Sequence, residues 1–208
     1  MTRSVNSKTR EISRCPWSLG SPEYVDYHDT EWGRPVTDET RLFEKVCLEG
    51  FQSGLAWITV LRKRDNFREA FAGFDPVKVA RFDDRKVERL LTNAGIIRHR
   101  GKIESAINNA RCLLAMHKAG ESLSDVAWSH ASRRRVAAPT GLSNLPAVTP
   151  ASTALSKDLK SRGWSFVGPT TMYAMMQCMG VVNDHLGSCH VRKACEAERR
   201  ELFARLDR

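Results

Sequence analysis

Apolar residues recur every three or four positions along most of the chain, which is the spacing of one face of an α-helix. The sustained alternation of apolar and polar residues that predicts half-buried strands is absent from the sequence. The clearest helical pattern covers residues 102–119 and is followed by Gly120, at a position that favours a helix C-terminus. Its apolar stripe consists of Ile103, Ala106, Ile107, Ala110, Leu113 and Leu114. The pattern therefore predicts an all-α protein.

Start and stop signals divide the rest of the chain into shorter helices. Thr37 is the expected N-cap of a helix that begins at position 38, and Asp75 and Asp83 are expected to cap two more. Residues 132–150 combine three arginines with several prolines, which predicts an irregular connection. Other helices are expected over 57–71, 83–95, 152–163, 170–179 and, as a solvated basic helix, 191–208.

The composition is that of an ordinary globular protein. The 208 residues are 41% hydrophobic and 27% charged, and the mass of 23.4 kDa suffices for one or two domains with a buried core. No apolar run approaches the roughly 20 residues of a membrane helix. No apolar stretch follows the basic N-terminus, as it would in a secretory signal. A cytoplasmic location without membrane contact is therefore expected.

Charge and cysteine usage narrow the partners and the chemistry. Lysine and arginine outnumber aspartate and glutamate by 33 to 24, giving a formal net charge of +9. This excess suits a polyanionic partner but does not separate DNA from RNA, or either from a role in solubility. Six cysteines without a secretion signal are not expected to form a disulfide framework. Cys47, Cys112 and Cys178 have apolar neighbours and are expected to be buried thiols, whereas Cys15 and Cys189 have different surroundings.

Two cysteines and two histidines form a candidate metal site that joins the two ends of the chain. Cys15 and His28 lie near the start, and His185 and Cys189 are four positions apart near the end. Two thiolates and two imidazoles complete a tetrahedral zinc site of the structural type, with no position left for water. The four-residue spacing predicts that the second pair shares one face of a helical turn. The alternative, by spacing alone, is four unrelated residues.

Acidic residues beside the two histidines could orient their rings. Asp26, Asp29 and Asp184 flank the histidines in sequence, and a metal-bound histidine commonly donates its second ring N–H to a carboxylate. The same aspartates could equally act as helix caps.

Aromatic residues concentrate between positions 17 and 57, and Glu49 lies among them. Phe43 and Phe51 have helical spacing to other apolar residues and are expected in the core. Tyrosine and tryptophan beside a carboxylate can instead hold a planar, electron-poor ring such as a cationic purine. The candidates for that role are Trp17, Tyr24, Tyr27, Trp32, Trp57 and Glu49. The alternative for Glu49 is an exposed carboxylate at a helix end.

A glycine turn precedes the last apolar helix. Residues 166–171 read FVGPTT, and free N–H groups at such a helix N-terminus can hold a DNA phosphate. Gly168, Thr170 and Thr171 are therefore candidate backbone contacts. Taken alone, this pattern favours a plain structural turn, because Gly-Pro before a helix is common.

Together these motifs closely resemble the 3-methyladenine DNA glycosylase I family. The resemblance covers about residues 14–189. It rests on RCPW at 14–17, YVDYHDTEWG at 24–33, LEGFQSGLAWITVL at 48–61, AGIIRHRGKI at 94–103, FVG at 166–168 and VNDH at 182–185. It implies a helix-hairpin-helix glycosylase fold with a basic, disordered extension at 1–13, a glycosylase unit at 14–190 and a basic helical tail at 191–208. The unit would form one compact body or two helical lobes.

The resemblance also implies roles for the candidate residues. Cys15, His28, His185 and Cys189 would hold one structural zinc ion per chain. Glu49 and Tyr27 would be the catalytic residues, with Tyr24, Trp57, Trp17 and Trp32 binding the base. The expected partner is double-stranded DNA with alkylated bases, the expected product is free 3-methyladenine, and a monomer is expected.

The chemistry that this implies is hydrolysis of a weakened N-glycosidic bond. Alkylation at N3 gives adenine a positive charge, so the flipped base leaves as a neutral species and water attacks the sugar carbon. Asp184 follows the glycine turn at 166–171 as an assisting aspartate does in related enzymes, but it adjoins a zinc ligand, so the resemblance favours Glu49. No lysine stands at a defensible position for Schiff-base chemistry, which predicts a monofunctional enzyme.

Two other functions are compatible with these residues. A zinc-stabilised module could recognise alkylated DNA without cutting it, although the retained Glu49 and pocket tyrosines argue against a lost active site. A zinc hydrolase requires an open metal position, which four protein ligands would close.

Overall fold

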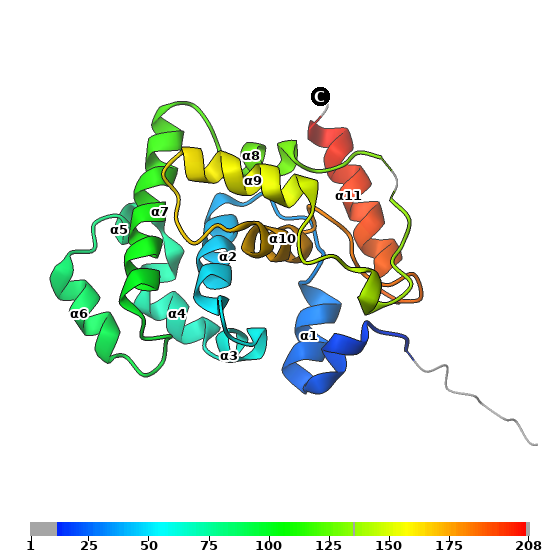
Figure 1. The fold of residues 1–208 in the computed structure, drawn as a ribbon, viewed down its shortest axis with the longest axis horizontal. Helices are drawn as coiled ribbons and strands as arrows, with labels where there is room; N and C mark the ends of the chain where they lie inside the picture. The colour runs from blue at the N-terminus through cyan, green and yellow to red at the C-terminus, as the bar shows by residue number, and fades with distance from the viewer. Residues whose placement is uncertain (1–11, 135, 207–208) are drawn as a thin grey trace, which may run out of the picture.

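The computed structural model describes residues 12–134 and 136–206, and all regular structure within these ranges is helical (Figure 1). The expectation of an all-α protein is thus confirmed for the described residues. The α-helices are α1 (Pro22–Thr30), α2 (Glu39–Gln52), α3 (Trp57–Leu61), α4 (Arg64–Ala70), α5 (Pro76–Val79), α6 (Asp84–Thr92), α7 (Arg100–Lys118), α8 (Leu123–Ser129), α9 (Pro150–Ser161), α10 (Pro169–Cys178) and α11 (Arg192–Leu206). Short 3₁₀ helices are η1 (Pro16–Gly20), η2 (Ala72–Phe74) and η3 (Leu142–Asn144). The predicted extension at 1–13 lies outside the described residues except for positions 12 and 13.

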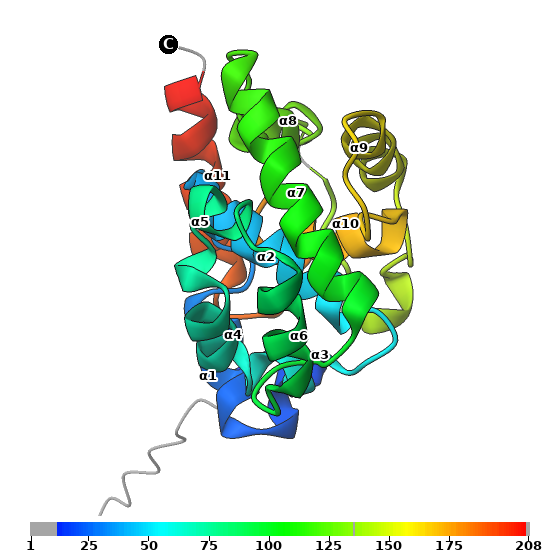
Figure 2. The same ribbon diagram turned by 90° about the vertical axis from the view of Figure 1, so that its left-hand side faces the viewer.

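Helix α2 occupies the middle of the molecule. Figure 1 shows α4, α5, α6 and α7 gathered on one side of it and α1 and α11 on the other. Figure 2, in which the first side faces the viewer, shows α7 running along α2, and the two helices are in contact. Nine residues of α2 are buried, and the phenylalanine rings of the core stack beside its end, with Phe71 and Phe74 5.5 Å apart and nearly parallel. No helix in the described part of the chain is long and apolar enough to cross a membrane.

Two predicted helix caps are confirmed, and three predicted helix starts, those of α2, α7 and α9, are shifted by one or two residues. The Asp75 and Asp83 carboxylates accept hydrogen bonds from main-chain N–H groups of α5 and α6. For α2, Asp38 rather than Thr37 is the N-cap, since its Oδ1 accepts from the N–H of Arg41 at 2.8 Å. Gly120 follows α7 with a φ of +75°, as its predicted role at a C-terminus requires.

The single helix predicted over 57–71 is wrong, because the chain bends between α3 and α4. Lys63 has φ −102° and ψ 2°, outside the helical range, and its Nζ donates to the carbonyl of Ala94 at 2.7 Å. Val60 and Phe67, on either side of the bend, are both fully buried. The apolar spacing thus continues through the bend and does not reveal it.

Helix α11 is confirmed, but one side of it is buried rather than solvated. Cys195, Arg199 and Leu202 are buried against the rest of the protein. Arg199 donates to the carbonyls of Gly180 and Val181 at 2.7 and 2.8 Å. A basic side chain is accommodated here because it satisfies the free carbonyls that follow α10.

A close main-chain contact ties the segment after α1 to the end of α10. The N–H of Val36 donates to the carbonyl of Met179 at 3.1 Å. At Gly180, with a φ of +71°, a Cβ atom would lie 2.6 Å from the main chain of Arg34 and Pro35. Only glycine fits this approach. The contact fixes α1 relative to α10, and the candidate site lies between α1, α2 and α10.

Candidate functional site

The predicted aromatic and acidic residues surround one cavity of about 230 Å³, called the aromatic cavity below. It is lined by Trp17, Tyr24, Tyr27, Trp32, Glu49, Gln52, Trp57, Leu145, Ala174 and Gln177. All six residues expected to contact a base therefore meet at one place, although they come from η1, α1, α2, α3 and the segment after α1.

Helix α1 positions the two tyrosines. Ser21 caps this helix by accepting from the N–H of Tyr24, and Pro22 starts it. Tyr24 and Tyr27 are three residues apart, so they share one helix face. The Tyr24 hydroxyl accepts from the main-chain N–H of Ile58 at 2.9 Å, which holds α1 against α3.

Tryptophans form the walls of the cavity. The Trp17 ring meets the rings of Tyr24 and Trp32 edge-on, with centroids 5.7 and 5.1 Å apart. On the other side, the rings of Tyr27 and Trp57 lie 5.6 Å apart at a tilt of 43°. Neighbouring aromatic rings hold one another in these orientations, which leaves a space between rigid apolar faces.

Glu49 is a buried carboxylate in the aromatic cavity and not an exposed helix end. Helix α2 continues to Gln52, beyond the apolar stripe that indicated it, so Glu49 lies in its last turn and is only 5% exposed. A carboxylate of this kind requires compensation by a cation or hydrogen bonds. Its Oε1 forms an ion pair with Lys45 Nζ at 3.0 Å, one helical turn earlier.

Lys45 is a buried charged residue beside the aromatic cavity that sequence reasoning missed. It is 5% exposed, its Nζ donates to the Tyr27 hydroxyl at 2.8 Å and lies 3.5 Å from the ring centroid of Trp57. Burial lowers the pKa of Lys45, but the coulombic effects of Cys178, Tyr27 and Glu49 outweigh it and raise that pKa. The available signal was a Lys–Glu pair at i, i+4 within an otherwise apolar helix.

Four residues that line the aromatic cavity were also missed, for different reasons. Gln52 follows Glu49 by three positions, so the helical repeat could have indicated it. Ala174 and Gln177 come from α10, and Leu145 comes from the irregular connection predicted at 132–150, which the structure confirms. No local pattern relates these distant segments to the aromatic residues.

The predicted glycine turn lies next to the aromatic cavity. Gly168 is the residue before α10, Thr170 is exposed, and no side chain caps the N–H groups of this helix start. Thr170 and Thr171 line a hollow of about 220 Å³ together with residues 53–55, Glu49 and Gln52. Glu49 thus lines both this hollow and the aromatic cavity, and the start of α10 lines the hollow.

A buried lysine organises the loop between α2 and α3. Lys102 Nζ donates to the main-chain carbonyls of Phe51 and Ser53 at 2.9 and 2.6 Å. These carbonyls lie at the C-terminal end of α2, where a cation is favoured. The loop that follows carries Leu55, which is 40% exposed beside the hollow in front of α10.

The four predicted metal ligands also come together. One potential ligand atom from each of Cys15, His28, His185 and Cys189 lies within 4.8 Å of the others, and all four residues are buried. Cys189 Sγ is 3.4 Å from His28 Nε2 and 3.5 Å from His185 Nδ1. The alternative of four unrelated residues is excluded, and this Cys/His cluster could hold a metal ion.

The chain segment of the second ligand pair is a loop, so the expected helical turn is wrong. Residues 184–189 form no helix, and the N–H of Cys189 donates to the carbonyl of Leu186 in a tighter turn. Gly33 makes room for the cluster, because a Cβ there would lie 2.7 Å from His185 Nε2.

The second nitrogen of each cluster histidine has a protein acceptor. His28 Nδ1 lies 2.7 Å from Asp29 Oδ1, which is the first of the two roles considered for that aspartate, while His185 Nε2 lies 2.9 Å from the carbonyl of Trp32. Both acceptors leave the other nitrogen free for a metal. In the part of the chain that the structure describes, neither Asp26 nor Asp184 is hydrogen bonded to a cluster histidine.

The chemistry of the cluster fits zinc. Zinc–sulfur bonds of about 2.3 Å and zinc–nitrogen bonds of about 2.0 Å in a tetrahedron separate the ligand atoms by roughly 3.5 Å, close to the distances in the cluster. A hydrogen bond from Cys15 lowers the pKa of the Cys189 thiol far below its usual range, against the effect of burial. His185 and His28 act in the same direction, which favours the thiolate that a metal requires.

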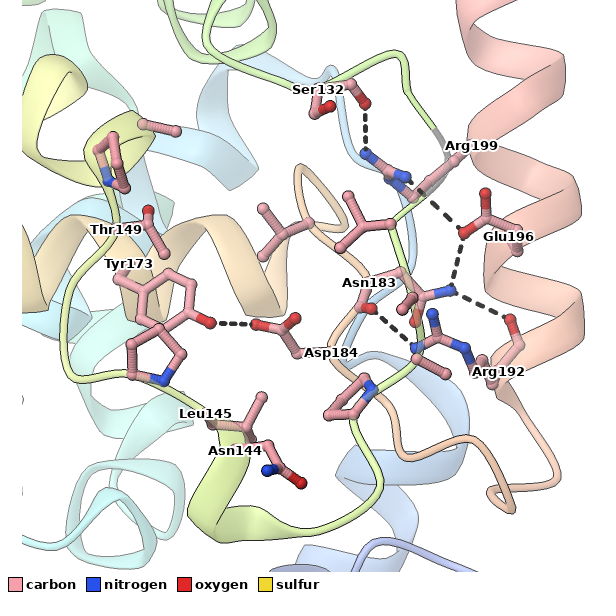
Figure 3. Close-up of a pocket in the computed structure, with 18 of the residues that line it drawn as sticks. Ser132, Asn144, Leu145, Thr149, Tyr173, Asn183, Asp184, Arg192, Glu196 and Arg199 are labelled. Carbon is pink, nitrogen blue, oxygen red and sulfur yellow. Dashed lines mark hydrogen bonds and ion pairs between the residues drawn. The ribbon is translucent and has the colours of Figure 1, made fainter.

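Asp184 lies at a different and larger cavity of about 690 Å³, between the irregular connection and α11 (Figure 3). Its Oδ2 accepts from the Tyr173 hydroxyl at 2.5 Å and from Gln177 Nε2 at 2.9 Å. The arginines of this cavity, Arg192 and Arg199, are bound to main-chain carbonyls. These groups hold the segment after α10 in place, and Asp184 does not line the aromatic cavity.

Comparison with known proteins agrees with this geometry. A family model described as methyladenine glycosylase matches residues 17–193. The chain is 53% identical over 179 residues to DNA-3-methyladenine glycosylase 1 of Escherichia coli (strain K12), covering 86% of this chain and 96% of that protein. It is 49% identical over 178 residues to DNA-3-methyladenine glycosylase of Haemophilus influenzae, covering 85% and 96%.

Solved structures give the same result. A crystal structure of 3-methyladenine DNA glycosylase I is 51% identical with a TM-score of 0.83, covering 86% of this chain and 98% of that one. The Staphylococcus aureus 3-methyladenine DNA glycosylase I, studied for its recognition of 3-methyladenine, is 34% identical with a TM-score of 0.82, covering 87% and 97%. The resemblance drawn from the sequence motifs is therefore confirmed: this chain belongs to the methyladenine glycosylase family.

Proposed function

We propose that this protein is a monofunctional DNA glycosylase that flips N3-methyladenine out of alkylated DNA and hydrolyses its glycosidic bond, leaving an abasic site. The observation that carries the proposal is the buried Glu49 carboxylate within a cavity walled by aromatic rings. The family relationship and the names of the relatives support the same activity.

The aromatic cavity supplies the binding energy for the flipped base. Tyr27 and Trp57 flank the base, Tyr24, Trp17 and Trp32 line the space around it, and Glu49 accepts hydrogen bonds from its edge. Flipping costs a few kcal/mol of stacking, which contacts with aromatic faces offset. The methylated base carries a positive charge that the carboxylate complements, so the cavity favours it over neutral adenine.

Bond cleavage then needs little acid catalysis, because the base leaves as a neutral molecule. Water attacks the sugar carbon as the bond breaks through an oxocarbenium-like state. Lys45 is paired with Glu49 and donates to the Tyr27 hydroxyl, and Lys102 donates to two main-chain carbonyls at the end of α2. Neither lysine is therefore available as a nucleophile. Hydrolysis without strand cleavage follows.

DNA binds across the free start of α10. Helices α9 and α10 and the turn between them form the helix-hairpin-helix element, and the two helices pack together. Gly168, Thr170 and Thr171 contact a phosphate through main-chain N–H groups and the helix dipole. The formal net charge of +9 supports binding to double-stranded DNA.

One structural zinc ion per chain joins the two ends of the protein. Cys15, His28, His185 and Cys189 would hold it, and the four-ligand site stabilises the fold without taking part in the reaction. A zinc ion bound there would fix η1 and α1, which carry Trp17, Tyr24 and Tyr27. The enzyme acts as a monomer.

The test is release of free base from methylated duplex DNA, followed by chromatography. We expect the wild type to release 3-methyladenine and Glu49→Gln to release it about 100-fold more slowly, with unchanged zinc content and folding. Gln52→Glu places a carboxylate at another residue of the cavity, and this control shows whether the negative charge must stand at position 49.

Two outcomes would contradict the proposal. Unchanged single-turnover excision by Glu49→Gln would remove this carboxylate from the mechanism. Tight binding of methylated DNA by the zinc-loaded wild type, without release of base, would show a damage-binding module instead.

A further inference from the structure

A buried ammonium stands behind the aromatic cavity, and the proposed mechanism does not use it. Lys45 Nζ lies 3.0 Å from Glu49 Oε1, 2.8 Å from the Tyr27 hydroxyl and 3.5 Å from the Trp57 ring centroid. A single charged group therefore contacts three residues of the cavity at once. Lys45 does not itself line the cavity.

Two neighbouring arginines have carboxylate partners of their own, which leaves Glu49 as the carboxylate of Lys45. Behind the cavity, Arg64 forms an ion pair with Glu31 at 2.6 Å, and Arg68 forms one with Glu44 at 2.9 Å. Arg41 lines a small hollow together with Lys45, Arg64 and Arg68. Among the described residues, Lys45 is the cation in contact with Glu49.

The other titratable groups that face this pair are neutral near pH 7. Burial raises the pKa of Cys178, whose Sγ is 3.9 Å from Glu49 Oε1, to about 12. Burial also raises the pKa of Tyr27 well above its usual value. Gln52 and Gln177, which line the cavity beside Glu49, carry no charge.

The ion pair with Lys45 uses only one oxygen of the Glu49 carboxylate. Oε1 faces both Lys45 and Cys178, whereas Oε2 accepts no hydrogen bond from the part of the chain that the structure describes. Glu49 lines the cavity. The carboxylate is thus held from behind and has one acceptor oxygen left for a ligand.

We propose that Lys45 is a positioning residue that keeps Glu49 ionised and turned so that Oε2 is offered to the flipped base. This inference rests on the proposed role of the aromatic cavity in base binding. Without the ammonium, a buried carboxylate favours its protonated form, because burial penalises the charge. A protonated Glu49 loses its attraction for the cationic base.

The decisive readout is the pH profile of excision. Single-turnover release of 3-methyladenine is measured from about pH 5.5 to about pH 8.5 for the wild type, Lys45→Met, Lys45→Arg, Glu49→Gln and Lys45→Met/Glu49→Gln. We expect Lys45→Met to lose about tenfold more activity at the acidic end than the wild type does. Lys45→Arg, which keeps the charge, retains the wild-type profile.

The double variant separates positioning from general damage to the fold. If Lys45 acts through Glu49, its removal costs nothing further once the carboxylate is gone. We therefore expect Lys45→Met/Glu49→Gln to match Glu49→Gln within about twofold at every pH. Lys78→Met serves as the matched control, because Lys78 pairs with Asp75 at 3.6 Å on the surface.

Three results would overturn the role of Lys45. These are an unchanged pH profile of Lys45→Met, a loss that Lys45→Arg shares equally, or a double variant slower than Glu49→Gln by about fivefold or more. If Lys45→Met does not fold, a double variant slower than Glu49→Gln still overturns the role of Lys45, because the double variant buries no unpaired charge. Failure of the proposed function would look different, because the wild type itself would release no base.

Discussion

The Cys/His cluster and the aromatic cavity both use α1, where His28 directly follows Tyr27, but their buried polar groups differ in how far they are satisfied. In the cluster, each histidine has one nitrogen facing a cysteine sulfur and the other facing a protein acceptor. In the cavity, the indole N–H of Trp57 is buried without a partner. Glu49 Oε2 accepts no hydrogen bond within the described residues, although it is not one of their fully buried unpaired atoms.

This difference distinguishes a stabilising site from a binding site. Buried polar groups are almost always satisfied in native proteins, and those that are not require an explanation. A fully satisfied set of ligands, closed to water, contributes to folding. A carboxylate with a free acceptor oxygen at a cavity can contribute to recognition of a ligand, which supplies the missing partner.

The largest effect is expected from breaking the closed site. Cys15→Ala removes one of four ligands, and we expect zinc content to fall well below one per chain and the melting temperature to drop by about 10 °C. Metal analysis and thermal denaturation measure both. Cys195→Ala is the control, since this thiol is buried near the cluster but is not one of its four residues. Equal losses in the two variants would show that the cluster has no special role in stability.

The fold was largely predictable where local signals decide it. The stripe from Ile103 to Leu114 and the Asp83 cap identified α7 and α6 because a helix repeat and a cap are properties of short segments. The bend at Lys63 was not predictable, since its hydrogen bond to Ala94 joins residues 31 positions apart. The same holds for His185 and Cys189, whose spacing suits a helix although the segment is a loop.

The site was predictable in its residue types but not in its charges. The aromatic residues and Glu49 could be grouped because they are close in sequence and belong to recognisable motifs. Lys45 reads as the polar position of an amphipathic helix, and only the packing of α1 and α3 against α2 turns that position inward. Leu145, Ala174 and Gln177 enter the cavity through long-range packing, which no local pattern records.

A smaller effect is expected from loosening the loop between α2 and α3, which lines the hollow in front of α10. Lys102→Met removes both hydrogen bonds to the carbonyls of Phe51 and Ser53, and we expect excision to slow by about tenfold. Binding of free 3-methyladenine should persist, because Lys102 does not line the aromatic cavity. Single-turnover kinetics and tryptophan fluorescence measure the two. Lys63→Met, which loses the hydrogen bond to the carbonyl of Ala94, is the control. Equal slowing in this variant would show that the loop between α2 and α3 has no special role in excision.

The smallest effect is expected at Cys178, and it tests which neighbour holds Glu49. The Cys178 sulfur lies 3.9 Å from Glu49 Oε1, but burial raises the pKa of this thiol to about 12, so it stays neutral through pH 9 and contributes only a weak hydrogen bond. We expect Cys178→Ala to change single-turnover excision by less than about twofold and to keep the wild-type pH profile. A loss that grows toward acidic pH would instead mean that the thiol shares in orienting the carboxylate. In that case Lys45 would not be the main support of Glu49, and the orientation of the carboxylate would depend on Cys178 of α10 as well as on Lys45 of α2.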